Sequence, residues 1–342
     1  MDIKRVLEKL SFAEDLNSDE AEASMNAIMS GEFNTEQVAG FLTAMRLKGE
    51  TVTELTAFVK VMREKSVKVN VNVDGAVDLV GTGGDKSGTF NISTVSTVVT
   101  AGAGVPVIKH GNRSASSKCG SADVLAQLGA KIELDHKGVE QVYNEVGMAF
   151  MFAPMFHPAM KYVMPARRAL GFRTFFNILG PLCNPAGVKR YVIGAFSKEV
   201  AEKMAHILAN LDTEFGYTFN SHDGLDEVST TSDAEIFEIQ DSLISESILF
   251  TPESIGFQRV EMDSLVGGKP VLNADIFNNI LDNKATKAQK EIALLNATFA
   301  IQASGKVETL ADAKELATDS LESGKARKLF NHFVEATNSV GV

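Results

Sequence analysis

The sequence predicts a two-domain protein, in which a small all-helical N-terminal domain precedes a large α/β domain with a mainly parallel central sheet. Two observations support this fold class. Apolar residues recur three and four positions apart through about the first 65 residues, as in amphipathic helices. From residue 76 onward, short apolar segments of strand type alternate with helical segments. We therefore expect domains at residues 1–70 and 71–342, with the segment 160–185 packing on the helical domain.

The expected N-terminal helices are marked by capping and stop residues. Ser18 is placed to cap a helix that ends near Gly31, and a second helix begins at Thr35 and ends at Gly49. Thr51 opens a third helix with a capping-box pattern. Short loops between amphipathic helices indicate a small bundle. The apolar faces of these helices serve either as core or as a contact between subunits.

Five strands are expected in the α/β domain, each a short run of mostly apolar residues before a loop. They cover residues 76–80, 105–108, 149–153, 191–195 and 215–220. Helices are expected at residues 93–103, 121–128, with Ser121 as its cap, and 197–211. After a β-rich section that ends near residue 257, further helices are expected at 286–295, 309–321 and 329–334. Ligands of parallel sheets bind at the carboxyl ends of the strands. The loops after the first two strands are therefore the first candidates for a site.

Composition restricts the class of protein. The chain has 342 residues, 44% of them apolar, which is enough for a sizeable core. Its net charge of −11 argues against broad binding to nucleic acid or to anionic membranes, because both need a basic surface. The two cysteines, Cys119 and Cys183, form no disulfide framework. The N-terminus lacks the apolar core of a signal peptide, so we expect a soluble, cytoplasmic protein.

Each of the first two strands leads into a loop rich in glycine and hydroxyl side chains that opens a helix. The loops read GTGGDKSGTFNIST at residues 81–94 and KHGNRSASS at residues 109–117. Glycine lets backbone N–H groups approach an anion closely, and the helix N-terminus adds partial positive charge. Lys109 and Arg113 add full charges. Two such loops fit a ligand with phosphates in two places, whereas the Gly-Lys-Ser/Thr of a Walker loop is absent.

An acidic pair follows the strand expected at residues 215–220. Asp226 and Glu227 stand in the run DGLDE. A bound polyphosphate usually requires Mg²⁺, which takes one or two carboxylates together with oxygens of the ligand. The pair is therefore a candidate metal site, although on its own it also fits a solvated acidic turn.

These segments together resemble the anthranilate phosphoribosyltransferase family. The resemblance is carried by GTGGD…TFNIST, KHGNRSASS…GSADVL, DGLDE and the block HPAMKYVMPARRALGFRTFFNILGPLCNPAG, and it extends over the whole chain. It implies a fold like that of the nucleoside phosphorylases and phosphoribosyltransferases. It also implies transfer of 5-phosphoribose from phosphoribosyl diphosphate to the amino group of anthranilate, a step of tryptophan biosynthesis. Mg²⁺ as cofactor and a homodimer formed through the helical domain are further implications.

The resemblance implies roles for individual residues. No protein residue is expected to act as a catalytic nucleophile, because the attacking amine belongs to anthranilate. The metal is expected at Ser93, Asp226 and Glu227, and anthranilate at Gly81, Asn112 and Arg167. Phosphoribosyl diphosphate is expected at Gly81, Gly84, Asp85, Thr89, Asn91, Ile92, Ser93, Thr94, Lys109, His110, Gly111, Asn112, Arg113, Ser114, Ala115, Ser116, Ser117 and Ser121.

Arg167 suits its implied role, because a guanidinium can hold a carboxylate through two parallel hydrogen bonds. Without the resemblance, a surface salt bridge is the commoner role for such an arginine. Arg168 points elsewhere on the same helix and serves as a control. His110 either packs within its loop or contacts the aromatic substrate, and both roles stay open. His157 belongs to the block around Arg167 and is not expected to be catalytic.

Two other functions are compatible with the sequence. A pyrimidine nucleoside phosphorylase shares the general architecture, but the KHGNR loop and the pair Asp226–Glu227 favour a metal-bound diphosphate donor. A non-catalytic relative that binds nucleic acid is disfavoured by the acidic composition. We expect anthranilate and phosphoribosyl diphosphate as partners, with no nucleic acid and no membrane.

Overall fold

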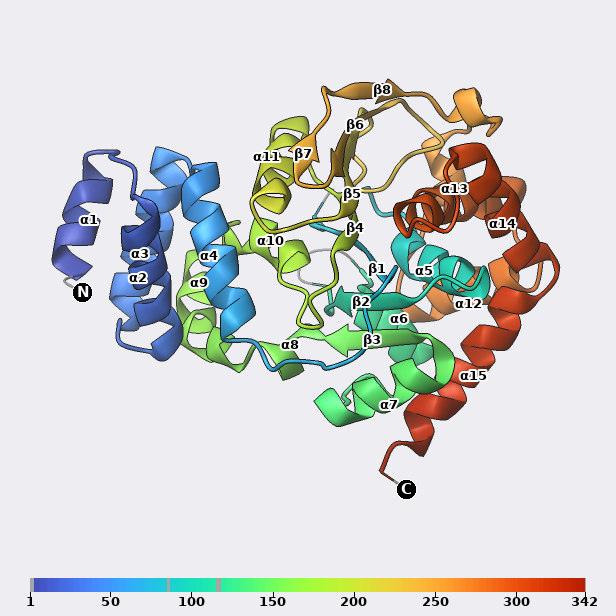
Figure 1. Cartoon of the computed structure of the whole chain (residues 1–342), viewed down its shortest axis with the longest axis horizontal. Coiled ribbons are helices and arrows are strands. Elements are labelled where there is room, and N and C mark those ends of the chain that lie inside the picture. The colour runs from blue at the N-terminus through green and yellow to red at the C-terminus, as the bar shows by residue number, and fades with distance from the viewer. Residues whose placement is uncertain (1–2, 85–86, 115–117, 342) are drawn as a thin grey trace.

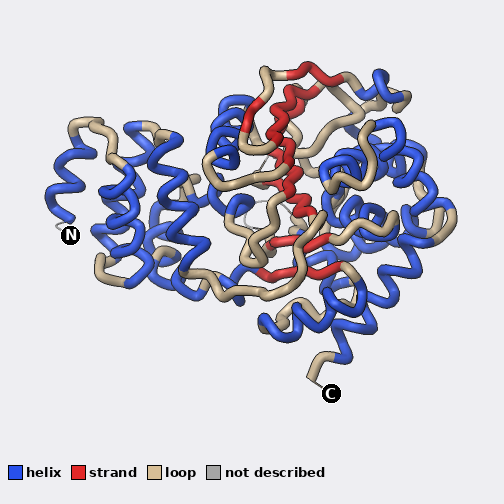
Figure 2. Tube along the Cα trace, viewed as in Figure 1, coloured by secondary structure: helices blue, strands red, loops and turns tan. Residues whose placement is uncertain are grey.

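The computed structural model describes residues 3–84, 87–114 and 118–341. A bundle of helices stands beside a larger α/β body, and the two chain ends lie at opposite ends of the molecule (Figure 1). The strands gather in the middle of the larger body, with helices around them (Figure 2). No helix within the described ranges is both long and apolar enough to cross a membrane.

The N-terminal bundle contains the helices α1 (Ile3–Ser11), α2 (Ser18–Ser30), α3 (Thr35–Lys48) and α4 (Val52–Glu64). The expectation that Ser18 caps α2 was wrong, because the preceding residue makes the cap. Asn17 Oδ1 accepts the N–H of Glu20 at 2.9 Å, and the Glu20 carboxylate accepts the N–H of Asn17 at 3.0 Å. The capping box expected between Thr51 and Glu54 is present.

A segment from the middle of the chain completes this bundle. It consists of the short elements α8 (Ala153–Phe156), η1 (Pro158–Tyr162), α9 (Met164–Leu170), α10 (Phe176–Leu179) and η2 (Gly180–Leu182). Of these, η1 packs on α2, α9 on α3 and α10 on α4. The Phe175 ring lies 4.8 Å from that of Phe58 and 6.2 Å from that of Phe41, centroid to centroid. Aromatic packing thus fixes residues 153–182 to the N-terminal helices.

The central sheet has the strand order β3-β2-β1-β4-β5-β6-β7, and β8 pairs with β6. The first five strands in this order are mutually parallel, and β6, β7 and β8 are antiparallel additions at one edge. The strands are β1 (Val77–Gly81), β2 (Val107–Gly111), β3 (Met148–Phe152), β4 (Arg190–Gly194), β5 (Phe215–Ser221), β6 (Ala234–Gln240), β7 (Leu243–Ile244) and β8 (Ile248–Phe250). The five expected strands and the β-rich section are confirmed, with strand ends shifted by at most three residues.

Helices pack around the sheet (Figure 1). Helices α5 and α13 pack on β1, whereas α11 packs on β5 and β6 and also reaches α4 of the bundle. Helix α7 was not expected, although Asp135 caps it by accepting the Gly138 N–H at 2.8 Å. The elements are α5 (Ile92–Gly102), α6 (Ser121–Gln127), α7 (His136–Val146), α11 (Lys198–Ala209), η3 (Pro252–Ile255), η4 (Met262–Leu265), α12 (Pro270–Leu281), α13 (Lys287–Ala303), α14 (Leu310–Glu322) and α15 (Lys325–Ser339).

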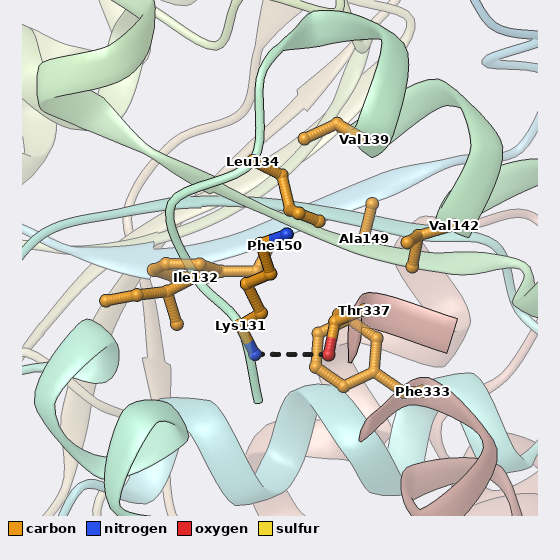
Figure 3. Close-up of a pocket in the computed structure, with 9 residues that line it drawn as sticks. All are labelled: Lys131, Ile132, Leu134, Val139, Val142, Ala149, Phe150, Phe333 and Thr337. Atoms are coloured by element: carbon orange, nitrogen blue, oxygen red, sulfur yellow. Dashed lines mark hydrogen bonds between the residues drawn. The ribbon is translucent and has the colours of Figure 1, made fainter. Parts of the chain in front are cut away.

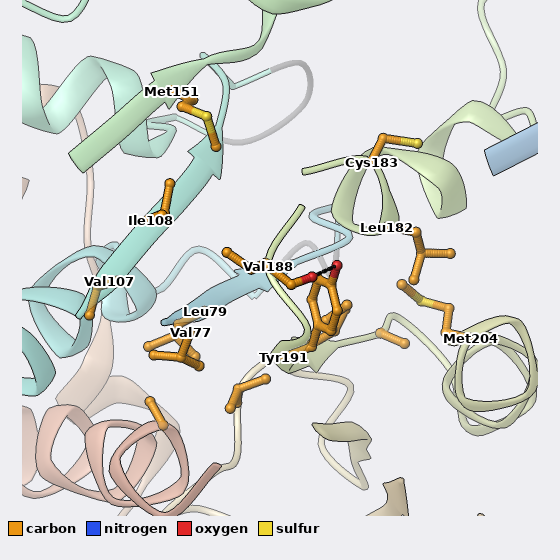
Figure 4. Close-up of a cluster of buried hydrophobic side chains, with 14 of the residues drawn as sticks. Val77, Leu79, Val107, Ile108, Met151, Leu182, Cys183, Val188, Tyr191 and Met204 are labelled. Carbon is orange, nitrogen blue, oxygen red and sulfur yellow. Dashed lines mark hydrogen bonds between the residues drawn. The ribbon is translucent and has the colours of Figure 1, made fainter. Parts of the chain in front are cut away.

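Apolar side chains from both faces of the sheet form the core. Figure 4 shows Val77, Leu79, Val107, Ile108 and Tyr191 within this buried cluster. A second packing region joins α7, β3 and α15 around Phe150 and Phe333 (Figure 3), and it leaves no room for a water molecule. The region around Phe150 and Phe333 is therefore packed core and holds no ligand site.

Candidate active site

The carboxyl ends of β1 and β4 bring the first loop against the acidic pair. Gly81 and Gly194 are paired in the sheet register, and a Cβ atom at either position would overlap Asp226. The Gly83 N–H donates to Asp226 Oδ2 at 2.6 Å. Glycine at these positions is therefore required by close packing, which holds the Asp226 carboxylate against the first loop.

Lys109, the first residue of the second loop, reaches across to the first loop. Its side chain is only 2% exposed, and its Nζ donates to the Leu79 carbonyl and, at 3.4 Å, to Ser93 Oγ. Burial lowers the pKa of Lys109 to about 8, against the opposing effect of the charges of Asp78, Glu227 and Asp226. The structure thus brings together Lys109, Ser93 and the acidic pair, which come from three separate parts of the sequence.

Asp78 is a buried counter-charge that the sequence pattern did not reveal. Its Oδ1 accepts the His110 N–H at 3.2 Å, and its Oδ2 accepts Asn184 Nδ2 at 2.8 Å. Burial raises the pKa of Asp78 to about 6, and the charge of Lys109 opposes that rise. Asp78 occupies an apolar strand position, so only the fold shows that it faces Lys109.

The first loop ends in the N-terminal turn of α5. Asn91 Oδ1 caps the helix by accepting the Thr94 N–H at 3.1 Å. Ile92, Ser93 and Thr94 form the first turn, where helix N–H groups lack intrahelical partners. Asp85, expected in this loop, lies outside the described residues, whereas Gly84 and Thr89 lie on either side of that gap.

Arg173 fastens the first loop to the bundle, a role with no signal in the sequence. Its Nη2 donates to the Gly84 carbonyl, and its guanidinium lies 4.5 Å from the centroid of the Phe196 ring. Gly84 has a φ of +77°, and a Cβ there would overlap Arg173. Arg46 of α3 donates in turn to the Arg173 carbonyl. The loop is therefore connected to α3 through two arginines.

The second loop is closed by Asp123 of α6. Its carboxylate accepts the N–H groups of Gly120 at 2.9 Å and Ser114 at 3.1 Å, and Arg113 Nη1 at 3.1 Å. Burial would raise the pKa of Asp123, but these N–H donors and the guanidinium outweigh it and lower the pKa. Arg113 is therefore a loop constituent as well as a source of charge.

The remaining residues of the second loop continue β2. Gly111 is the last residue of that strand, and the Asn112 carbonyl accepts Ser121 Oγ at 3.4 Å. Ser121 is the first residue of α6 and not its cap, which is Gly120, so that expectation was wrong. The other expected members, Ala115, Ser116 and Ser117, lie outside the described residues.

Arg167 lies on α9 in the segment that joins the bundle. It is partly buried, and its guanidinium reaches Asn177 Oδ1 at 3.4 Å and lies 5.5 Å from the centroid of the Phe176 ring. Burial lowers the pKa of Arg167. Arg168 is exposed, as expected for a control. The structure thus places Arg167 on the bundle side, with α10 rather than with the phosphate-type loops.

Two buried histidines lie between these regions. The rings of His110 and His157 are 5.1 Å apart, and burial lowers the pKa of His110 to about 3 and that of His157 to about 4. Within the described ranges, His110 Nε2 has no hydrogen-bond partner. Both rings are therefore neutral at neutral pH.

The donor set suits a magnesium ion that is shared with a ligand. Asp226 is buried and Glu227 is half-buried. The Ser93 hydroxyl accepts a hydrogen bond from Lys109, whose pKa is affected by both carboxylates. Within the described part of the chain, no three His, Cys, Asp or Glu side chains gather as a metal site. Two carboxylates fit Mg²⁺, which prefers oxygen donors and takes further ligands from bound phosphates.

Comparison with known proteins gives the same architecture. Residues 3–66 match the model described as glycosyl transferase family, helical bundle domain, and residues 73–327 match that family's a/b domain. The chain is 45% identical to the anthranilate phosphoribosyltransferase of Salinibacter ruber over 95% of this chain and 96% of that one.

Solved structures are also similar. The anthranilate phosphoribosyltransferase of Thermus thermophilus has a TM-score of 0.92 at 37% identity, covering 99% of this chain and 100% of its own. The Saccharomyces cerevisiae enzyme in complex with PRPP and Mg has a TM-score of 0.91 at 26% identity, over 99% and 98%. The same yeast enzyme in complex with 4-fluoroanthranilate has a TM-score of 0.88 at 25% identity, over 99% of each chain.

Proposed function

This chain belongs to the anthranilate phosphoribosyltransferase family, and we propose that its two loops and acidic pair bind the substrates of that family's reaction. The chain transfers 5-phosphoribose from phosphoribosyl diphosphate to the amino group of anthranilate, and diphosphate is the second product. This is a step of tryptophan biosynthesis. The observation that carries the function is 45% identity along 95% of the chain to an enzyme of this activity.

The phosphoribosyl donor binds at the carboxyl edge of the sheet. Glycine-rich turns at Gly81 and Gly84, the first turn of α5 and the second loop offer backbone N–H groups and hydroxyls to its phosphates. Lys109 contributes a full positive charge from below. Supporting this placement, Ser93, Lys109 and the acidic pair meet at one point although their sequence positions are far apart. The contacts expected between the two loops and phosphoribosyl diphosphate are part of this proposal.

Mg²⁺ is held by Asp226 and Glu227, with the Ser93 hydroxyl as a further ligand. The charges of the pair interact with that of Lys109, which offsets part of their mutual repulsion while the site is free. When bound, Mg²⁺ supplies positive charge to the leaving diphosphate. The yeast relative's complex with PRPP and Mg supports the same ion for this chain.

Anthranilate binds on the bundle side, where Arg167 pairs with its carboxylate. Gly81 and Asn112 stand where the two substrates meet, and Asn177 and Phe176 hold the guanidinium in place. A partly buried arginine is well suited to a carboxylate, because low polarity strengthens the ion pair. The neutral ring of His110 fits contact with the aromatic ring, which remains a prediction.

The residues act mainly by positioning and by charge stabilisation. Bond breaking at the anomeric carbon runs ahead of bond making, with oxocarbenium-like character. Lys109 and the loop N–H groups stabilise the departing diphosphate, while Arg167 aligns the amine for attack. The amine attacks directly, without a covalent ribosyl–enzyme intermediate. Mass spectrometry of a single turnover that finds such an adduct would overturn this mechanism.

The helical domain covers residues 1–70 and the α/β domain residues 71–342. The chain also forms a homodimer through the helical bundle. Leu47 is 82% exposed and Phe12 72% exposed, although both are large apolar residues. Leu47 lines an open groove of about 570 Å³ between α1 and α3, with Leu10, Ala39, Gly40 and Ala44 among its lining residues. An apolar groove with exposed apolar residues fits a second copy of the chain.

Anthranilate fluorescence provides the test of the proposed function. Purified protein with Mg²⁺ and phosphoribosyl diphosphate should consume the fluorescence of anthranilate, and omission of the donor should abolish the change. Thymidine with inorganic phosphate should give no phosphorolysis in the same preparation. Thymidine turnover without anthranilate turnover would instead identify a nucleoside phosphorylase.

A further inference from the structure

Two buried asparagines outside both loops each hold the main chain of one part of the site. We propose that Asn273 positions the donor loop and that Asn296 positions the metal-binding segment. Neither side chain is expected to touch a ligand, so both are positioning residues. The inference rests on the function proposed above, which assigns the donor and the metal to these two segments.

Asn273 connects α12 to the end of the first loop. It is 2% exposed, and its Oδ1 accepts the Asn91 N–H at 2.7 Å. Its Nδ2 donates to the Gly268 carbonyl at 2.7 Å and to that of Lys269 at 3.3 Å. Asn91 is itself the cap of α5, two residues before Ser93. A single side chain therefore fixes the start of the helix that faces the donor phosphates.

The same loop lies along residues 265–268, which we call the strap. The Phe90 N–H donates to the Leu265 carbonyl at 3.0 Å, and the Gly267 N–H donates to the Gly88 carbonyl at 2.9 Å. A Cβ at Gly267 would overlap the Phe90 backbone, so only glycine permits this approach. Asn273 bonds both the strap, at Gly268, and the loop, and it therefore locks the two together.

Asn296 has the corresponding arrangement at the metal-binding segment. It lies on α13, is 1% exposed and accepts the Val228 N–H at 3.0 Å through Oδ1. Its Nδ2 donates to the Val228 carbonyl at 2.9 Å and to that of Ile292 at 2.9 Å. Val228 directly follows Glu227, so the peptide group between them is held by a core helix. The direction of the Glu227 side chain depends on this peptide group.

Removal of either amide should loosen one segment and not the other. Loss of the Asn273 amide leaves the partly buried Asn91 N–H without its partner, and the loop must move to satisfy it. Small displacements of positioning groups weaken ligand binding and turnover strongly. Because the two asparagines hold different segments, Asn273→Ala should weaken donor binding, whereas Asn296→Ala should raise the Mg²⁺ requirement.

Ser320→Ala is the matched control. Ser320 of α14 is fully buried, and its Oγ donates at 2.7 Å to the Val99 carbonyl, near the end of α5 away from the loop. The variant removes a buried hydrogen bond between a C-terminal helix and α5 without touching either segment. It separates general destabilisation from loss of positioning.

The experiment uses the full-length protein and measures binding as well as turnover. Isothermal titration gives the Kd of phosphoribosyl diphosphate at saturating Mg²⁺, and the donor-induced rise in Tm gives the Mg²⁺ midpoint. Asn273→Ala should raise the donor Kd about tenfold or more. Asn296→Ala should raise the Mg²⁺ midpoint at least about fivefold, with the donor Kd at saturating Mg²⁺ within about threefold of wild type. Ser320→Ala should lower Tm and leave both values within about twofold.

Further variants keep the inference testable if an alanine variant does not fold. Gly267→Ala should reproduce the donor effect of Asn273→Ala by pushing the strap off Phe90. Asn273→Ser and Asn296→Ser should give the same separation with smaller losses of stability. If the asparagine variants lower Tm but bind like Ser320→Ala, the inference is wrong while the proposed function stands. Absence of any donor response in wild type would instead contradict the proposed function.

Discussion

Lys109 shows how one residue sets the electrostatics of the site. It is buried and interacts with the charges of Asp78, Glu227 and Asp226. Burial outweighs their attraction, so the lysine has a pKa of about 8. A lysine in this state is charged at neutral pH but close to losing its proton. The charge proposed to attract the donor is therefore sensitive to pH above neutrality.

Donor binding should weaken above pH 8. Below about pH 8 Lys109 is charged and the donor Kd should be nearly flat, whereas above it the Kd should rise by up to about tenfold per pH unit. The unfolded-state pKa is near 10.5, so between pH 8 and 10.5 the unfolded chain binds more protons and this lysine's contribution to folding stability increases with pH. Titration calorimetry from pH 6.5 to 9.5 checks the binding, and Lys109→Met should lose the inflection. A flat profile in wild type would contradict the assignment.

The acidic pair should account for the metal dependence. Changing Asp226 to Asn and Glu227 to Gln together keeps the shape of both side chains and removes two negative charges. We expect turnover to fall on the order of 100-fold or more and the Mg²⁺ dependence to weaken, because the ion loses its charged ligands. Steady-state rates across a Mg²⁺ titration measure this. An unchanged titration curve would remove the pair from the metal site.

Arg167 should affect one substrate only. Arg167→Ala removes a charge-assisted contact that contributes about 1.5–3 kcal/mol, which corresponds to a rise in the KM for anthranilate of roughly 10- to 100-fold. The KM for the donor should change much less. Arg168→Ala, on the exposed side of the same helix, should leave both values unchanged. Equal rises in both KM values would place Arg167 outside the acceptor site.

At the scale of elements, the first loop is held from two directions. The strap and Asn273 hold its end, and Arg173 connects its glycine turn to α3 through Arg46. The contacts of Arg173 cross between the bundle side and the sheet side. This latch, formed by Arg46 and Arg173, therefore couples the position of the donor loop to the bundle.

Breaking the latch should loosen the donor loop. Arg173→Ala should raise the KM for phosphoribosyl diphosphate by about tenfold, because Gly84 loses its anchor while the acceptor side stays intact. Arg173→Lys should not restore it, since an ammonium cannot stack on Phe196 and reach the Gly84 carbonyl as a planar guanidinium does. Steady-state kinetics with Arg168→Ala as control provides the measurement. A donor KM within twofold of wild type would show that the latch has no role in binding.

Element ends illustrate what local sequence can predict. The capping box at Thr51 and the glycine stop at Gly31 are confirmed, because the partners in each cap lie within four residues of each other in the chain. The caps expected at Ser18 and Ser121 were wrong by one residue. Near Ser121, Asp123 accepts the N–H of Gly120, which becomes the cap, and also that of Ser114 in the second loop. The shape of that loop is not encoded by a local sequence pattern.

At the scale of the whole molecule, the proposed site draws on both the bundle and the sheet domain. The groups proposed to bind the donor lie at the carboxyl edge of the sheet, and Arg167 comes from the segment that packs on the bundle (Figure 1). The exposed groove between α1 and α3 lies on the bundle, and α11 separates the bundle from β5 and β6. Dimerisation through the groove would leave the sheet edge accessible to substrates.

A single charged substitution in the groove tests the proposed dimer. Leu47→Glu places a carboxylate in the apolar groove, and its desolvation in an interface should disfavour association. Light scattering on a sizing column should show wild type at about twice 36.8 kDa and the variant shifted toward 36.8 kDa. Leu249→Glu, at an exposed position on β8, should remain dimeric. A monomeric wild type would contradict the proposed assembly.

The sequence alone determined the fold class, the five parallel strands and the two loops, because these depend on periodicity and on glycine and hydroxyl residues that are contiguous in the chain. Only the tertiary structure decided which charges meet. Asp78 reads as an ordinary strand position, Asn273 and Asn296 as polar helix positions, and Arg173 as a loop arginine. Each acts through a partner more than 30 residues away in the chain. Asp78 bonds His110, and Asn273 bonds Asn91. Asn296 bonds Val228, and Arg173 bonds Gly84. Such contacts arise from the order of strands in the sheet and from helix packing, which local patterns do not specify.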